Sequence, residues 1–169
     1  EQSMRRALEL DPLSLPITTN IGFCHHFARR YTAAITQFRR ALDMDGDFAE
    51  AHRGLGEAHE QCGELDQAIE HYRRALRFSG GSSEVIGALG RALALAGRVE
   101  EAASYLETLA QLAEERYVSA HERAAIHVGL GQREAALDWL TRGVEERSYK
   151  LVYLRVDPNL DQLRSDPRF

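Results

Sequence analysis

The stretch Ala-Glu-Ala-His-Arg-Gly-Leu-Gly-Glu-Ala-His, at positions 49–59, decides the fold class. Small or apolar side chains recur in it at a helical spacing, at Ala51, Leu55 and Ala58. Gly63 then interrupts the pattern in the way that a helix end prefers. The spacing resumes over 65–78, where the apolar side chains are Leu65, Ala68, Ile69, Tyr72, Ala75 and Leu76. The segment therefore predicts two helices joined by a tight turn.

This two-helix pattern recurs every 34 residues. Small residues recur at this step in two series, Gly22, Gly56, Gly90 and Ala124, and Ala34, Ala68, Ala102 and Ala136. Bulky residues recur at Phe38, Tyr72, Leu106 and Leu140. Glycines of the predicted turns recur at Gly63, Gly97 and Gly131. No insertion interrupts the register, so the sequence predicts complete repeats at 15–48, 49–82, 83–116 and 117–150. The small positions predict a close approach of two helices, with the bulky residues filling the space beside them. One such hairpin cannot bury its apolar face alone, so neighbouring hairpins are expected to stack.

The composition agrees with one all-α domain over residues 1–169. Apolar residues make up 44% of the chain and charged residues 28%, and no proline occurs between Ile17 and Val156. The net charge of −5 gives no general attraction to nucleic acid or to an anionic membrane. No apolar run is long enough to span a bilayer. We therefore expect no nucleic-acid partner and no membrane contact from this segment.

The stretch at 49–59 and the second-helix residues Ala68 and Tyr72 resemble the tetratricopeptide repeat. That family places Leu-Gly in the first helix of each repeat, and alanine and an aromatic residue in the second. The resemblance covers residues 1–150 and is weaker in the fourth repeat, where Arg123-Ala124 replaces Leu-Gly. It implies an all-α, α-solenoid fold of helical hairpins, whose first helices line a concave groove for a protein or peptide.

The two ends of the chain depart from the repeat. Residues 1–14 match only the second helix of a repeat, and the chain starts at Glu1 rather than Met. Both features predict that the natural protein extends upstream, and that a partly apolar edge is exposed here and open to homo-oligomerisation. Residues 151–169 predict a capping tail of short helices over the last hairpin. Asp157-Pro158 and Ser165-Asp166-Pro167 each place a capping acid before a proline, which predicts a helix start at both.

The last third of the chain is similar to the C-terminal end of certain bacterial multidomain proteins. The similarity rests on Tyr117-Val118-Ser119, Glu145-Glu146-Arg147-Ser148 and Leu163-Arg164-Ser165-Asp166-Pro167-Arg168-Phe169. Those proteins join tetratricopeptide arrays to a regulatory kinase, a nucleotide cyclase or a winged-helix transcription factor. The similarity implies a bacterial regulatory parent and a cytoplasmic location, or an extracytoplasmic one if the parent carries a transmembrane segment.

Histidine and cysteine residues are the candidates in this sequence for metal binding and nucleophilic catalysis. His25, His59 and His127 fall at one phase of the repeat, but equivalent positions of stacked repeats lie too far apart to share an ion whose ligands are about 2 Å from it. We interpret them as packing residues with a polar edge. Cys24 and Cys62 fall where the other repeats have small or apolar residues, which predicts buried thiols. With no phosphate-binding loop either, the sequence predicts no enzyme activity, no catalytic residue, no metal site and no cofactor.

The predicted groove is lined by residues of the first helices, at the positions that the resemblance carries onto this chain. These candidate partner-binding residues are Phe23, His26, Phe27, Arg53, Glu57, Glu60, Arg91 and His121. Phe23 and Phe27 are the expected apolar anchors, and Arg53, Glu57 and Arg91 the expected polar contacts. The alternative interpretation is that Phe23 and Phe27 packed against a missing upstream helix.

Pairs of arginines recur at the repeat spacing on the second helices, at Arg5, Arg6, Arg39, Arg40, Arg73 and Arg74. Stacking would align them into a basic stripe outside the groove. One interpretation is a solvated helix face whose arginines pair with nearby acids such as Glu70. The other is a docking strip for an acidic partner domain.

The leading hypothesis is a protein–protein interaction module that belongs to a larger bacterial regulatory protein. A gap-free helical array without recognisable catalytic residues motivates it. The second hypothesis is a structural spacer or a self-association module that uses the open ends or the arginine stripe. An enzyme is the third and the least favoured.

Overall fold

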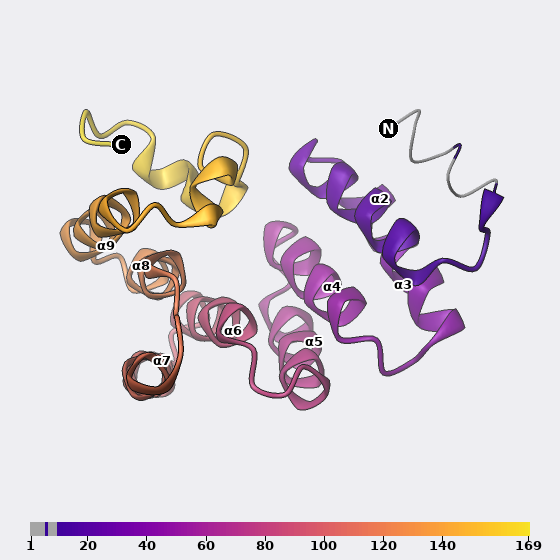
Figure 1. Cartoon of the computed structure of the whole chain (residues 1–169), viewed down its shortest axis with the longest axis horizontal. Coiled ribbons are helices and arrows are strands. Elements are labelled where there is room, and N and C mark those ends of the chain that lie inside the picture. The colour runs from indigo at the N-terminus through magenta and orange to yellow at the C-terminus, as the bar shows by residue number, and fades with distance from the viewer. Residues whose placement is uncertain (1–5, 7–9) are drawn as a thin grey trace. The chain divides into compact units, whose positions relative to one another are not determined.

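The computed structural model describes residue 6 and residues 10–169, and within them every regular element is a helix (Figure 1). The predicted all-α class is confirmed. The helices form two compact units, residues 1–81 (unit 1) and residues 82–169 (unit 2). The single-domain and repeat boundaries inferred from the sequence stay predictions.

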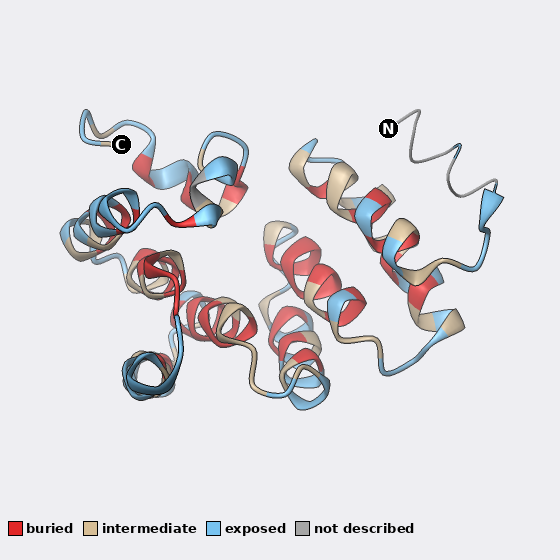
Figure 2. Ribbon diagram, in the orientation of Figure 1, coloured by how far each residue is buried: buried red, intermediate tan, exposed pale blue. Residues whose placement is uncertain are grey.

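Unit 1 contains two helical hairpins. The first consists of α2 (Leu15–Phe27) and α3 (Tyr31–Met44), and the second of α4 (Ala49–Gln61) and α5 (Leu65–Phe78). Besides its hairpin partner α5, α4 packs against α3 and α2. As a result α4 is buried along most of its length, whereas α3 and α5 each bury one stripe (Figure 2).

Two aromatic rings in unit 1 lie against glycines of neighbouring helices. Phe38 is fully buried, and a Cβ atom at Gly22 or Gly54 would lie only 2.5 Å or 2.3 Å from its ring. Tyr72 is likewise buried, and a Cβ at Gly56 would lie 2.6 Å from it. The sequence analysis assigned the small residues to a close approach of two helices. It also predicted that bulky residues fill the space beside them, and the rings of Phe38 and Tyr72 confirm this in unit 1.

Unit 2 contains two further hairpins and the C-terminal tail. Its elements are α6 (Ser83–Leu95), α7 (Val99–Glu115), α8 (Ala120–Gly129), α9 (Arg133–Glu145) and the 3₁₀ helices η1 (Tyr149–Tyr153) and η2 (Pro158–Leu163). Helix α8 packs against α6, α7, α9 and η2, so it is the central element of this unit.

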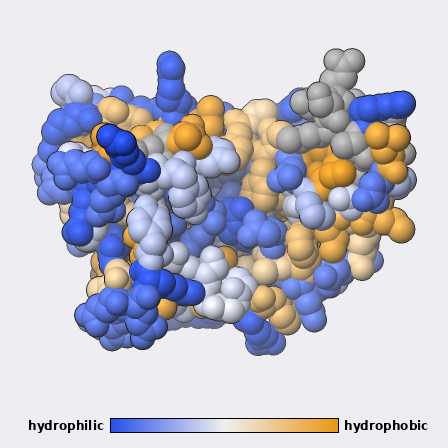
Figure 3. Space-filling view, viewed as in Figure 1, coloured by the Kyte–Doolittle hydropathy of each residue, from blue (hydrophilic) through white to orange (hydrophobic). Residues whose placement is uncertain are grey.

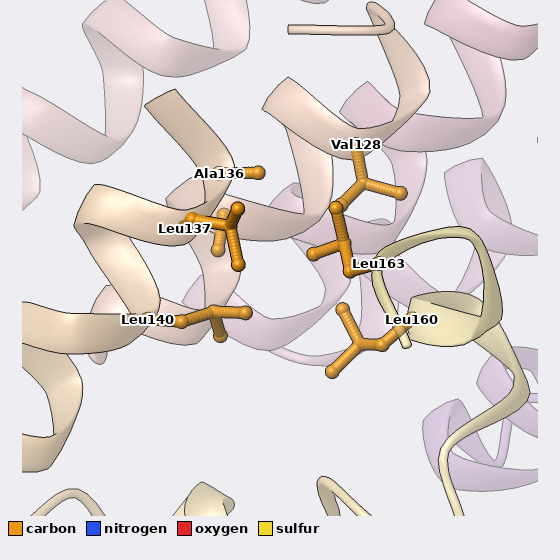
Figure 4. Close-up of a cluster of buried hydrophobic side chains, with 7 residues drawn as sticks. Val128, Ala136, Leu137, Leu140, Leu160 and Leu163 are labelled. Carbon is orange, nitrogen blue, oxygen red and sulfur yellow. The ribbon is translucent and has the colours of Figure 1, made fainter. Parts of the chain in front are cut away.

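The tail covers the last hairpin, as predicted, and does so through η2. Leu160 and Leu163 are 0% and 2% exposed. They join one apolar cluster with residues of α8 and α9, which are Ala124, Val128, Ala136, Leu137 and Leu140 (Figure 4). Burying two leucines ties the tail to the hairpin by several kcal/mol, at about 1.5–3 kcal/mol for each side chain.

Only one of the two helix starts predicted in the tail is present. Asp157 caps η2, because its side chain accepts a hydrogen bond from the Asn159 amide at 2.9 Å and Pro158 follows it. Ser165-Asp166-Pro167 forms a turn instead, so that prediction is wrong. The Asp166 carboxylate accepts from the Arg168 amide at 3.0 Å, which is the local bond of an Asx turn.

The hairpin turns share a geometry that ends each first helix. In each, one residue has positive φ, and the next amide donates to the carbonyl five residues back, as in a Schellman motif. Gly63, Gly97 and Gly131 supply the positive φ in three hairpins. In the first hairpin the same position is Arg29, with φ of 59°. A left-handed backbone clashes with a Cβ atom, so this turn carries strain that the glycine turns lack.

The predicted burial of the cysteines is wrong for Cys62, which is exposed. It is the C-cap of α4, and its phase equivalents Ala28 and Ala96, the C-caps of α2 and α6, are also solvent-accessible. Cys24 is partly exposed, whereas its phase equivalent Ala58 is fully buried.

Much of the predicted leading helix, including Met4, Ala7 and Leu8, lies outside the described residues. Within residues 10–14, Leu10 and Leu13 are 76% and 77% exposed, so this part of the chain does present apolar side chains. Figure 3 also shows apolar patches over the part of the molecule built by α2 and α3.

Replacing Arg29 by glycine should stabilise the protein by about 0.5–1 kcal/mol, because glycine adopts positive φ without a Cβ clash. The urea midpoint measures the change. The reciprocal substitution Gly63→Ala, at φ of 78°, should lower the midpoint by a similar amount. Unchanged midpoints for both variants would show that these turns carry no strain.

Replacing Gly54 by alanine should destabilise the protein by about 1–3 kcal/mol, because the new methyl group overlaps the buried ring of Phe38. Gly46→Ala is the matched control, since a Cβ there meets nothing closer than the Leu42 carbonyl oxygen at 3.9 Å. Thermal unfolding followed by circular dichroism compares the two. The overlap is not structurally important if both variants melt together.

Candidate partner-binding faces

The predicted groove residues divide between the two units. Phe23, His26 and Phe27 lie on α2, and Arg53, Glu57 and Glu60 on α4, all in unit 1. Arg91 lies on α6 and His121 on α8, in unit 2. The residues therefore form two faces, one on α2 and α4 (the unit 1 face) and one on α6 and α8 (the unit 2 face). Their role in binding stays a prediction.

Arg53 is the centre of the unit 1 face. Its guanidinium lies over the ring of Phe23, 4.4 Å from the ring centroid, which is a cation–π contact. The same group donates to Glu50 at 2.8 Å and to Glu57. Phe23 in turn meets the buried Phe38 ring edge-on, with the centroids 4.9 Å apart. The arginine is thus held in one orientation by a ring below it and a carboxylate on each side.

His26 and Glu60 are more buried than a contact residue needs to be. His26 is 1% exposed, with Nε2 3.7 Å from Glu57 Oε2, and its ring contacts Phe27. Glu60 is 6% exposed and accepts a hydrogen bond from the Tyr72 hydroxyl at 3.0 Å. In this structure both side chains contribute to packing between helices, and the accessible part of the face is Arg53, Glu50 and the edge of Phe27.

On the unit 2 face, the C-terminal tail already contacts the predicted positions. Arg91 is only 3% exposed. His121 Nε2 lies 3.2 Å from Asp157 Oδ2, at the start of η2. Lys150 of η1 forms an ion pair with Glu84, near the start of α6. The sequence analysis missed Lys150 and Asp157 because neither lies within a first helix.

The arginine stripe is partly described. Arg5 lies outside the described residues, and Arg6 is exposed. Arg39 and Arg40 on α3 and Arg73 and Arg74 on α5 are all exposed, and Arg74 donates to Glu70 at 2.5 Å as one interpretation expected. The docking role of the stripe stays a prediction.

A stack of three histidines occupies the α4–α5 hairpin. The ring of His71 on α5 lies parallel to that of His59, with centroids 5.5 Å apart, and His71 Nδ1 is 3.1 Å from His52 Nδ1. His52 Nε2 lies 3.0 Å from the carbonyl oxygen of Gly46, which can only accept, so His52 donates there. With His52 neutral, its Nδ1 must accept, and His71 is therefore protonated on Nδ1. The sequence analysis anticipated packing for His59 and missed His71.

Burial and like charge disfavour protonation of this stack. Burial, together with the nearby His52, His59 and Arg74, lowers the pKa of His71 to about 4. Burial also lowers the pKa of His52. Within the described residues no group of three or more His, Cys, Asp or Glu side chains is arranged to hold a metal ion. Nor does any helix in the described part of the chain have the length and apolarity needed to cross a membrane.

Two models of the tetratricopeptide repeat match the chain, at residues 27–83 and 61–124. Together they span residues 27–124, so the chain contains tetratricopeptide repeats. No curated protein matches it. The fold and the matches together define an all-α α-solenoid of tetratricopeptide hairpins with a C-terminal tail.

Solved structures share this fold. A chain in the crystal structure of the APC/C hetero-tetramer Cut9–Hcn1 aligns with a TM-score of 0.70 and 19% identity over 95% of this chain, which spans only 32% of that one. YrrB, described as a TPR protein with an unusual peptide-binding site, aligns with a TM-score of 0.61 and 16% identity, covering 98% of this chain and 86% of its own. MamA aligns with a TM-score of 0.60 and 20% identity, covering 90% and 89%. Similarity at these identities shows the fold alone.

Acidification should destabilise the protein through His71. The pKa of His71 is about 4 in the folded state, and its ordinary value is 6.5. Between these pH values His71 is therefore protonated in the unfolded chain and neutral in the folded chain. The contribution of His71 to the free energy of unfolding is therefore fully present above pH 6.5 and is lost as the pH falls towards 4. For this partly exposed ring we expect a loss of about 1–2 kcal/mol after allowing for solvent screening.

The change in urea midpoint between pH 7.5 and pH 5 measures this loss, compared between wild type and His71→Gln. The variant should lose less stability than the wild type. His127→Gln is the control, because His127 lies in unit 2 and bonds to Gln132 instead. An equal loss in wild type and His71→Gln would show that the stack does not titrate in this range.

Proposed function

We propose that this chain is a non-catalytic protein–protein interaction module that binds a peptide or partner segment on the unit 1 face of α2 and α4. The observation that carries the proposal is the fixed Arg53, which lies on Phe23 between Glu50 and Glu57. An arginine that is already oriented loses little side-chain entropy when it binds, and a neighbouring ring offers apolar contact.

The comparisons support this proposal at the level of the fold. Tetratricopeptide arrays serve as scaffolds, and the similar protein YrrB has a peptide-binding site. Glu50 and Glu57 already flank Arg53 and repel a strongly acidic segment, so the favoured partner offers a neutral hydrogen-bond acceptor to the guanidinium and an apolar side chain to the Phe23 and Phe27 edges. The proposal also retains a bacterial regulatory protein as the parent and a cytoplasmic location.

A second candidate is a spacer or self-association module. Exposed Leu10 and Leu13 favour it, because apolar side chains at the edge of an array are suited to pairing with another copy. Concentration-dependent sedimentation, abolished by Leu10→Ser and Leu13→Ser, would favour this candidate over the first.

Binding of linear peptides tests the proposed function. Peptides selected on the wild-type protein from a random display library should bind Arg53→Ala about tenfold or more weakly, as expected for a central contact worth above 1.4 kcal/mol. Arg40→Ala, an exposed arginine on α3, should leave the affinity unchanged. Fluorescence anisotropy measures both, with circular dichroism melts to confirm folding.

Failure to select any peptide, or equal affinity for wild type and Arg53→Ala, would overturn the assignment of this face. Loss of affinity in Arg40→Ala alone would move the binding surface to the arginine stripe.

A further inference from the structure

The C-terminal tail lies along the first-helix side of unit 2. Lys150 pairs with Glu84 of α6, and Asp157 pairs with His121 of α8 at 3.2 Å. Further along, the Gln162 side chain donates to the Val128 carbonyl of α8 at 3.1 Å. Glu84, His121 and Val128 all lie on first helices, which the family resemblance places along the partner groove. The chain's own tail therefore occupies this face as a ligand would.

Lys150 lies in a small acidic site. Glu122 of α8 is 3% exposed, and its Oε2 has no hydrogen-bond partner among the described residues. Glu122 packs against Gly87, which follows Glu84 by about one turn on α6, since a Cβ at Gly87 would be 2.9 Å from the Glu122 Cβ. The Lys150 ammonium also lies over the ring of Tyr149, 5.5 Å from its centroid. The two carboxylates form a site suited to an ammonium group.

The electrostatics of the site agree with this description. Burial raises the pKa of Glu122, whereas His121 and Lys150 lower it. The cation therefore offsets part of the cost of a buried carboxylate. Lys150 is the only lysine among 21 lysine and arginine residues, and its side chain is only 13% exposed.

The two parts of the tail are held differently. Leu160 and Leu163 of η2 are buried in the apolar cluster. In the preceding segment Tyr149, Val152, Tyr153 and Val156 are 61%, 75%, 43% and 44% exposed, whereas Leu154 is partly buried against the same cluster. Because Lys150 is held by polar contacts and its neighbours Tyr149 and Val152 are exposed, the turn around Lys150 can leave the face while Leu154 and η2 stay anchored.

We propose that the acidic site formed by Glu84 and Glu122 recognises a lysine side chain on a partner protein, and that Lys150 is a resident occupant which the partner's lysine displaces. The inference deepens the proposed function by giving unit 2 a ligand chemistry, and it rests on that function.

Peptide binding to a chain without the resident lysine tests this inference. The probe is a dye-labelled synthetic peptide with the sequence of residues 148–158, Ser-Tyr-Lys-Leu-Val-Tyr-Leu-Arg-Val-Asp-Pro. Lys150→Met should bind it about tenfold more tightly than the wild type, because no internal ammonium competes. The same peptide with an acetylated lysine should bind Lys150→Met about tenfold more weakly, and adding Glu84→Gln should have the same effect.

A second measurement does not depend on the fold of a variant at position 150. Acylation of the lysine amine reports on Lys150 alone once peptide mapping separates the N-terminal amine. The wild-type protein should react about tenfold more slowly than the free peptide, and Glu84→Gln should react faster than wild type. Glu134→Gln, which removes an exposed partner of Arg168, should not change the rate.

Equal affinities of wild type and Lys150→Met, or of the two peptides, would overturn the inference, as would acylation at the rate of the free peptide. None of these outcomes depends on Arg53. A failure of the proposed unit 1 face would instead appear as Arg53-independent binding of the selected peptides, with the Lys150 results unchanged.

Discussion

The contact between an aromatic ring on one helix and a glycine on its neighbour is the constraint on which unit 1 depends. Phe38 lies so close to Gly22 and Gly54 that neither position has room for a methyl group. The ring supplies apolar burial, and the two glycines supply the space for it. The contact fixes the distance of α3 from both α2 and α4, and thereby sets the relation between the two helices that carry the candidate face.

That constraint extends from the core to the surface through a short series of contacts. The buried Phe38 supports Phe23 edge-on, and Phe23 supports the guanidinium of Arg53. Arg53 shares Glu57 with the buried His26. Each group is oriented by the one beneath it, so the partly buried Arg53 is held rigidly by its contacts with the core. A surface arginine held only by its own helix neighbours would keep more rotamer freedom and would lose more entropy on binding.

Features that repeat every 34 residues could be predicted from the sequence, and features that occur once could not. The spacing of Gly63, Gly97 and Gly131 predicted the turns, and the helical periodicity of the apolar residues predicted the paired helices. Arg29 has the same backbone conformation as these glycines, but a residue with a Cβ gives no such signal. The failed helix start at Asp166 has the same origin, because a capping acid before a proline is compatible with an Asx turn as well as with a helix.

The candidate faces were predicted less well than the fold, for a related reason. Phase within the repeat correctly selects residues of the first helices, but it does not say what covers them. Glu60 bonds to Tyr72 across its hairpin, and His121 pairs with the tail through Asp157. Pairings that join residues distant in sequence have no period, so they require the folded structure.

The choice of lysine at position 150 follows from the shape of its site. Elsewhere the chain uses arginine for its basic side chains. At Arg53 the planar guanidinium lies flat on the Phe23 ring, with Glu50 on one side and Glu57 on the other. A guanidinium bonds best to acceptors that lie in its own plane. Around Lys150, by contrast, the acceptors come from two helices, with Glu84 on α6 and the buried Glu122 on α8. A compact ammonium with three rotatable donors can serve carboxylates in different directions, and its flexible stem also allows it to leave.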